Sequence, residues 1–417
     1  MAAFPKVTTW VFFFLTIATA LSLSHNAEGN NVKSSTLVPP TKDPFYTAPI
    51  GYHNAAPGTI LRLRHAPGNL TTVVANCSAA YHVLYRTTDS RYKPSYAITT
   101  VYVPRKPTRK ALLSLQVPYN TPDVDHSPSY DVYFGPPADL ESALSLGWHV
   151  NLPDHQGPIG AGGLGVGQAH ATLDSVRAAL AMDIGLHHDV RYALWGYSGG
   201  AFASEWTAEL QASYAPELHF SGMALGGMPV NVSSVWNVTN KSKYTGMMPL
   251  FSTILTKVYL EAYSYLVSQL KVDGPHNKTG FLEVLHMNAF EAFAYFAEQD
   301  IWDYFLNGSA VLDAPILRHL VDNTLYLGYH GIPQMPILMY HAVHDEAALI
   351  ELADNLRERY CRVHTDILLQ KNLVGNHIEE MTNGAPTALE WLGSVFDGRN
   401  YVGSGCTVRE VSVSRDI

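Results

Sequence analysis

Residues 192–210 read YALWGYSGGAFASEWTAEL, and this stretch decides the fold. Its first four residues are apolar or aromatic and predict a buried strand, whereas residues 201–210 predict a helix. Between them, the pentapeptide Gly196-Tyr197-Ser198-Gly199-Gly200 fits the pattern Gly-x-Ser-x-Gly. Flanking glycines leave room for a serine on a tight turn, and the N-terminus of the helix favours negative charge. The stretch therefore predicts Ser198 as an exposed nucleophile, with the Gly199 amide as one oxyanion donor; the alternative is a turn serine that caps a helix.

A serine hydroxyl is a weak nucleophile unless an oriented base takes its proton. In enzymes that use such a turn, a carboxylate and then a histidine follow the serine along the chain. Asp345 follows the predicted strand 337–342, and His377 lies in a loop after the predicted strand 365–369. We therefore assign Asp345 as the orienting acid and His377 as the base. The rival bases are His341 and His344, and the rival acids are Asp154 and Asp322.

A second oxyanion donor is expected from the loop after an earlier strand. The predicted strand 111–117 is followed by Pro118-Tyr119-Asn120-Thr121, and this loop is our candidate. A Gly-x-Gly-x-x-Gly pattern at 160–165 does not begin at the end of a strand, so it does not predict a dinucleotide site. No cofactor is expected, and no metal site is expected because paired Cys-x-x-Cys or His-x-x-x-His ligands do not occur.

Short β-rich segments alternate with helical ones over most of the chain, which indicates an α/β fold with a mainly parallel central sheet. The predicted strands are 80–86, 96–103, 111–117, 148–152, 192–196, 220–225, 337–342 and 365–369. The predicted helices are 170–182, 199–213 and 387–396. Between about 230 and 332 the alternation stops, and aromatic, Met and Leu residues recur at helical spacing. We interpret this segment as an inserted helical cap, or lid, near the nucleophile; the alternative is a helical subdomain with no part in the site.

The N-terminus has the pattern of a secretory signal peptide, with Lys6 before the apolar run 10–17 and a small-residue cleavage site at 18–20. An uncleaved signal anchor is the alternative. No later stretch has the ~20 apolar residues of a membrane span, so we expect a soluble, secreted, extracellular protein. The resulting domains are a signal peptide 1–24, an N-terminal arm 25–58, a first core part 59–229, the insertion 230–332, and a second core part with a C-terminal extension 333–417. Seven glycosylation sequons agree with export: Asn69, Asn76, Asn231, Asn237, Asn240, Asn277 and Asn307.

The three cysteines allow one disulfide and one free thiol. We expect Cys361 to pair with Cys406, with Cys77 as an alternative partner. The net charge of −9 argues against nucleic acid as a partner, and we expect a monomer.

The sequence resembles the fungal secretory lipase family, of the Candida antarctica lipase A type. The matching segments include Gln116-Val117, Pro128-Ser129-Tyr130, 153–158, 170–179, 196–200, 224–227, 341–346 and Asn376-His377. The resemblance implies an α/β-hydrolase fold with a helical cap, a Ser198–Asp345–His377 triad, activity on long-chain esters and a disulfide near the C-terminus. One departure concerns the oxyanion loop, where the family's acidic residue corresponds to Asn120.

We expect a carboxylic ester hydrolase that cleaves lipid esters, with triacylglycerol lipase activity, through an acyl-enzyme on Ser198. Transient binding to a lipid–water interface is part of this expectation. The alternatives are an esterase or acyltransferase for one bulky secreted metabolite, and a catalytically inactive lipid-binding glycoprotein.

Overall fold

The computed structural model describes residues 37–160, 165–399 and 405–415. The predicted signal peptide, the first part of the arm and glycines 162 and 163 lie outside these residues. No helix in the described part of the chain is long and apolar enough to span a membrane.

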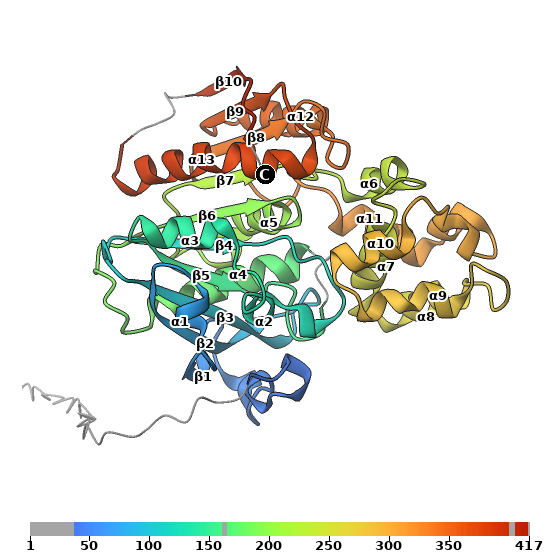
Figure 1. The fold of residues 1–417 in the computed structure, drawn as a ribbon, viewed down its shortest axis with the longest axis horizontal. Coiled ribbons are helices and arrows are strands. Elements are labelled where there is room, and N and C mark those ends of the chain that lie inside the picture. Colours follow the sequence, from blue (N-terminus) through green and yellow to red (C-terminus); the bar gives the residue numbers. More distant parts are fainter. Residues whose placement is uncertain (1–36, 161–164, 400–404, 416–417) are drawn as a thin grey trace, which may run out of the picture. The chain divides into compact units, whose positions relative to one another are not determined.

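The centre of the fold is a ten-stranded sheet in the order β1-β2-β3-β5-β4-β6-β7-β8-β9-β10 (Figure 1). Its strands are β1 (Ile60–His65), β2 (Cys77–Thr88), β3 (Pro94–Pro104), β4 (Ala111–Gln116), β5 (His149–Pro153), β6 (Arg191–Tyr197), β7 (Met223–Gly226), β8 (Ile337–Ala342), β9 (Ile367–Asn372) and β10 (Cys406–Val411). The pairs β1–β2, β2–β3 and β3–β5 are antiparallel. All pairs from β5–β4 to β9–β10 are parallel. The predicted α/β class with a mainly parallel sheet is confirmed.

Helices cover both faces of this sheet. Side chains alternate along β6, so that Leu194 enters one buried cluster and Ala193 and Trp195 enter another. The Leu194 side is covered by α4 (Gly165–Leu180), α5 (Gly199–Tyr214) and α12 (Ile350–Cys361), which contribute buried residues to the first cluster. The other side is covered by α3 (Ala138–Ser145) and α13 (His377–Phe396). Short α1 (Leu70–Val73) and α2 (Pro128–Asp131) lie beside β2 and β5. Both faces are therefore buried, as a parallel sheet requires.

All eight predicted strands are present, but the predictions missed β1 and β10, and β7 begins at Met223 rather than at residue 220. β10 is an edge strand, most of whose residues are exposed, so it lacks the apolar pattern on which the prediction depended. α13 begins at His377, ten residues earlier than predicted. Pro386 lies inside this helix, just before the predicted start, and Asn376 caps the helix together with Glu379.

The segment between β7 and β8, which we call the helical insertion, contains helices and turns with two isolated β-bridges. Its elements are α6 (Val232–Thr239), α7 (Met247–Lys257), α8 (Leu260–Ser268), α9 (Lys278–Leu282), η5 (Glu283–His286), α10 (Ala289–Phe296), η6 (Ile301–Tyr304), η7 (Gly308–Asp313) and α11 (Pro315–Thr324). Figure 1 draws them in yellow-green (α6) to orange (α11) beside the sheet. Phe281, Phe296 and Tyr304 pack in edge-to-face contacts at its centre. The predicted domain bounds stay predictions.

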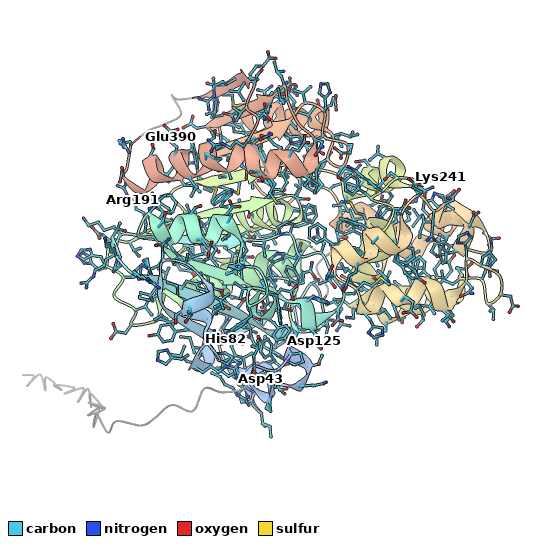
Figure 2. All side chains as sticks on the ribbon, in the orientation of Figure 1. Asp43, His82, Asp125, Arg191, Lys241 and Glu390 are labelled. Atoms are coloured by element: carbon cyan, nitrogen blue, oxygen red, sulfur yellow. A yellow bond between two sulfur atoms is a disulfide. The ribbon has the colours of Figure 1, made fainter. Side chains whose placement is uncertain are left out.

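A disulfide and a set of short turns lie near the two ends of the described chain. Cys361, at the end of α12, forms a disulfide with Cys406 at the start of β10, as predicted, and Cys77 is a buried free thiol. Residues 37–58 form the short turns η1 (Pro40–Lys42), η2 (Pro44–Tyr46) and η3 (Tyr52–Asn54). Arg64 donates to Asp43, and its Nη2 is also 3.2 Å from His82 Nδ1; Figure 2 labels Asp43 and His82.

Candidate active site

Ser198 lies on the tight turn between β6 and α5, with φ 50° and ψ −121°. A positive φ is strained for a serine and persists only where its surroundings fix it. The Ser198 amide donates to Gly226 O at 2.8 Å, and Ser198 O accepts from Phe202 N at 2.9 Å. A Cβ at residue 196 would lie 2.2 Å from Gly200 O, and one at residue 200 would lie 1.8 Å from Gln116 O. The two outer glycines of the pentapeptide therefore let the turn pack against its own helix and against β4.

The three residues assigned from chain order lie together. His377 Nε2 is 2.9 Å from Ser198 Oγ, and His377 Nδ1 is 2.7 Å from Asp345 Oδ2. Asp345 Oδ1 accepts from the amides of Ala347 and Ala348 at 2.9 and 2.7 Å. Burial would raise the pKa of Asp345, but the imidazoles of His341 and His377 outweigh it, and the pKa lies well below its ordinary value. Asp345 is thus a carboxylate at neutral pH, placed to orient His377.

His377 is fixed by its backbone as well as by its ring. It is the first residue of α13, after the cap Asn376, whose Oδ1 accepts from Ile378 N and Glu379 N at 3.0 and 3.1 Å. His377 N donates to Glu346 Oε2 at 3.0 Å, and His377 O accepts from Tyr197 Oη at 2.5 Å. The ring is therefore held between the acid and the serine by the start of a long helix.

The rival residues lie elsewhere. His341 touches the acid rather than the serine, because its Nε2 is 3.2 Å from Asp345 Oδ2 and 2.6 Å from Ala348 O. His344 and Asp322 are exposed. Asp154 is buried, and both of its oxygens accept from Ser129, from N at 2.8 Å and from Oγ at 2.6 Å.

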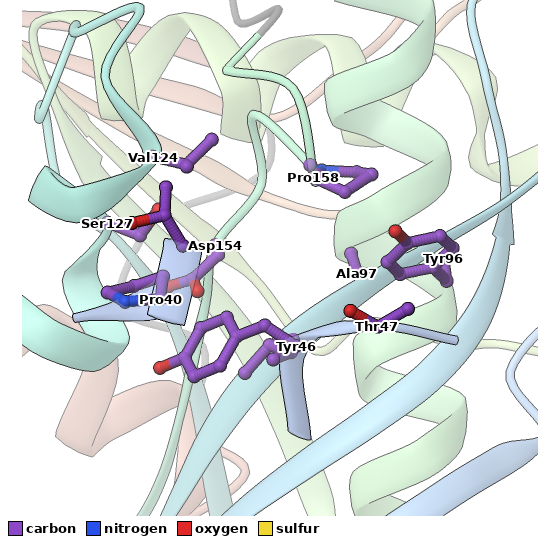
Figure 3. A pocket seen from close by; sticks show the side chains of 12 residues that line it. Pro40, Tyr46, Thr47, Tyr96, Ala97, Val124, Ser127, Asp154 and Pro158 are labelled. Atoms are coloured by element: carbon purple, nitrogen blue, oxygen red, sulfur yellow. The ribbon is translucent and has the colours of Figure 1, made fainter. Parts of the chain in front are cut away.

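Asp154 lines a pocket of about 250 Å³ that neither Ser198 nor His377 lines. Figure 3 shows this pocket, with Tyr46 from η2 and Pro158 among its walls. Burial raises the pKa of Asp154 to about 7, and the hydrogen bonds from Ser129 oppose this shift. Both oxygens of Asp154 accept hydrogen bonds from Ser129. Neither Ser198 nor His377 lines its pocket, so Asp154 is not placed to act as the acid.

Asn120 lies next to the nucleophile turn, with φ 41°. A Cβ at residue 199 would lie 2.2 Å from Asn120 Oδ1 and 2.9 Å from its Nδ2. The Asn120 side chain therefore occupies the space that the missing Cβ of Gly199 leaves. The structure thus brings together the two residues that the sequence suggests as oxyanion donors.

Sequence reasoning missed the contacts that hold the loop around Asn120. Thr121 Oγ1 donates to Met287 O at 2.7 Å, and Lys257 Nζ donates to Pro122 O at 2.5 Å. Both partners belong to the helical insertion. No local pattern identifies these pairs, because 166 and 135 residues separate their members.

A buried pair of carboxyl groups lies further along α5. Tyr360 Oη donates to Glu205 Oε1 at 2.5 Å and is 3.3 Å from Glu209 Oε1. Burial, and then the charge of Glu209, raises the pKa of Glu205 to about 8. Glu209 accepts from the amides of Gly328 and His330 at 2.5 and 2.7 Å. Glu209 therefore ties α5 to the last part of the helical insertion, just before β8.

The described part of the chain has no cluster of three or more His, Cys, Asp or Glu residues able to hold a metal ion. Among the sequon asparagines, Asn69, Asn76 and Asn307 are exposed, whereas Asn231, Asn240 and Asn277 are partly buried. The side chain of Asn237 lies outside the described residues. Glycosylation stays a prediction for all seven.

Comparison with known proteins gives a family and close relatives. A family model described as secretory lipase matches residues 138–404. The chain is 43% identical to a trichothecene C-3 esterase of Fusarium sporotrichioides, over 91% of this chain and 89% of that protein. It is 39% identical to a probable trichothecene esterase of Stachybotrys chartarum, over 92% and 82%. The closed state of Candida antarctica lipase A is similar with a TM-score of 0.80 and 26% identity, over 90% of this chain and 91% of that one.

Proposed function

We propose that this chain cleaves an ester of a bulky, multi-ring alcohol of the trichothecene kind. The chain belongs to the secretory lipase family and is a carboxylic ester hydrolase. The observation that carries the catalytic part is the hydrogen-bonded series from Ser198 through His377 to Asp345. The helix N-terminus after the serine adds a local field that favours negative charge.

In the proposed mechanism, Ser198 Oγ attacks the ester carbonyl while His377 Nε2 takes the hydroxyl proton. The amides of Gly199 and Asn120 stabilise the negative oxygen of the tetrahedral intermediate. When this intermediate collapses, the alcohol leaves with the proton from His377, and the acyl group stays on Ser198. Water then attacks the acyl-enzyme through the same histidine and releases the acid. Asp345 fixes the tautomer of His377 and stabilises its cationic form.

The choice of substrate class is supported by the relatives. Identity to the two trichothecene esterases is 43% and 39%, whereas identity to the fungal lipases found in the same comparison is 30–32%. A hydrolase selects its substrate through the walls of its pocket rather than through its triad. The greater overall similarity to the esterases therefore favours an ester of a bulky, multi-ring alcohol.

A second candidate is the lipase activity on triacylglycerols that the sequence pattern also suggests. It is favoured by the TM-score of 0.80 to a lipase in its closed state and by exposed apolar side chains on the insertion. These include Leu260 and Phe290, which are 72% and 75% exposed. In this reading, the insertion at 230–332 is a cap that touches a lipid–water interface.

A fluorophosphonate probe tests the nucleophile. We expect labelling of the wild-type protein and loss of labelling in Ser198→Ala; an unlabelled wild type would instead favour a ligand carrier. Substrate class is then tested by comparing kcat/KM on a C-3-esterified trichothecene with that on an emulsified triacylglycerol. The proposal expects the trichothecene ester to be preferred, and a preference for long-chain triacylglycerol would replace it with the second candidate.

The description of the family as secretory, together with the N-terminal pattern, supports a place of action outside the cell. Recovery of the active protein from culture medium, with the N-terminal segment removed, is the expected result. Activity confined to the cells would contradict it.

A further inference from the structure

The loop that carries Asn120, residues 117–122, is held on its first half by the core. His155 Nε2 donates to Val117 O at 3.1 Å. Gln156 N donates to Tyr119 Oη at 2.6 Å. Burial lowers the pKa of His155 to about 4, so its ring is neutral at neutral pH. These contacts fix the chain up to the residue before Asn120.

The second half of the loop is held by the helical insertion instead. Thr121 is fully buried, and its Oγ1 donates to Met287 O at 2.7 Å while accepting from Asp123 N at 3.0 Å. Lys257, the last residue of α7, donates from Nζ to Pro122 O at 2.5 Å. Two consecutive residues after Asn120 are thus bonded to two separate elements of the insertion.

Asn120 needs support on both sides because of its own backbone. Its φ of 41° lies in the left-handed region, which few residues other than glycine adopt, although Asn adopts it more readily than most. Such a conformation relaxes unless neighbouring contacts fix it. The φ angle of Asn120 also sets the direction of its amide N–H, which is the proposed second oxyanion donor. Loss of the hydrogen bonds at residues 121 and 122 would therefore change the direction of this N–H while the fold stays intact.

The ammonium group of Lys257 is partly buried where it meets the loop. Burial lowers the pKa of its ammonium group, which Asp123 partly offsets. Among the residues that the structure describes, no carboxylate oxygen lies within salt-bridge distance of its Nζ. A partly buried ammonium group therefore directs its hydrogen bond to the Asn120 loop.

We propose that Thr121 and Lys257 are positioning residues, through which the helical insertion aims the Asn120 amide at the oxyanion formed on Ser198. This inference rests on the proposed function, since it assumes that the Asn120 amide is an oxyanion donor. The insertion then does more than cover the site. When it is correctly placed, it holds the Asn120 amide in position. When it is displaced, the triad stays intact but the transition state is stabilised less.

The test compares two loss variants with two variants that keep a donor, Lys257→Arg and Thr121→Ser. Lys257→Met removes the hydrogen bond to Pro122 O. Thr121→Val removes both the bond to Met287 O and the bond from Asp123 N. Lys271→Met is a matched control, because Lys271 Nζ also donates to a backbone oxygen, Asp303 O at 2.6 Å, but within the insertion. On a soluble ester we expect kcat to fall about tenfold in each of the two loss variants, as one weakened oxyanion contact would produce. KM should change less than threefold. The Arg and Ser variants should recover most of kcat, and the control should match the wild type.

A second readout separates positioning from general destabilisation. A trifluoromethyl ketone forms a tetrahedral adduct on the serine, so its Ki should rise in the same proportion as kcat/KM falls. The Ki of the product alcohol, which carries no oxyanion, should not change. Either an unchanged kcat in both Lys257→Met and Thr121→Val, or an equal loss in the Lys271 control, overturns the inference. If one variant fails to fold, as thermal unfolding would reveal, the other still decides.

The failure of this inference can be distinguished from that of the proposed function. If the fluorophosphonate does not label Ser198 in the wild type, the proposed function fails. If labelling is normal but the variants keep the wild-type kcat and Ki, only the positioning role fails.

Discussion

Substituting Gly199 with alanine tests how the second oxyanion donor is placed. The new methyl group would lie 2.2 Å from Asn120 Oδ1 and 2.9 Å from its Nδ2, so the Asn120 side chain must move away. The Gly199 amide itself is kept, and alanine favours a helical position over glycine by up to ~1 kcal/mol. We therefore expect a loss of activity without a loss of stability.

The expected size follows from the backbone amide of Asn120, whose direction should change when its side chain moves. Loss of one oxyanion donor lowers kcat by about 10²–10³, which corresponds to about 2.7–4 kcal/mol of transition-state stabilisation. Steady-state kinetics on a soluble ester, with thermal unfolding measured in parallel, would check this. Gly200→Ala is the contrasting variant, because its Cβ would lie 1.8 Å from the backbone oxygen of Gln116. Backbone atoms cannot rotate away, so this variant should lose about 1–3 kcal/mol of stability.

A double-mutant cycle shows whether the effect passes through Asn120. In Asn120→Ala the side chain that meets the new methyl group is gone, so Gly199→Ala should cost little more in that background. The double variant should then be within about threefold of Asn120→Ala, and the coupling energy should nearly equal the effect of Gly199→Ala alone. Additive effects, or a Gly199→Ala variant that keeps the wild-type kcat, would refute this reasoning.

Three other predictions concern the acid, the disulfide and the buried carboxyl pair. Asp345→Asn should lower kcat by about 10⁴ with the fold intact, because an amide no longer fixes the tautomer of His377; a loss below tenfold would contradict the assignment. Cys406→Ser opens the bridge to Cys361, which spans 45 residues, and should cost about 4 kcal/mol in the free energy of unfolding, measured by denaturant titration. The pKa of Glu205 is raised from 4.5 to about 8 in the folded protein, so the folded state holds more protons than the unfolded state between these values and stability falls as pH rises. Glu205→Gln should therefore raise the melting temperature at pH 8 more than at pH 5, and equal shifts at both pH values would contradict this cause.

Much of the core fold could be predicted because its signals are local. The strand, turn and helix around Ser198 lie within 25 residues, and their apolar periodicity and glycines are visible in the sequence. The parallel strands follow from the same alternation. β10 could not be found in this way, since it is an exposed edge whose attachment depends on pairing with β9 and on a disulfide. The start of α13 was missed because a proline inside a helix usually marks a boundary.

The sequence by itself determined the nucleophile turn and the chain order of the three proposed triad residues, since each follows a recognisable strand. Only the tertiary structure decided which groups surround them. Asn120, after β4, meets Gly199, after the neighbouring strand β6, and Thr121 and Lys257 join the Asn120 loop to the insertion over more than 130 residues. Contacts of this kind produce no periodic pattern in the sequence. Each depends on a single hydroxyl or ammonium group, and the residues beside that group in the sequence do not take part in the contact. Ser198 could therefore be identified from its own sequence context, whereas the direction of the proposed oxyanion donor on Asn120 depends on how distant segments pack.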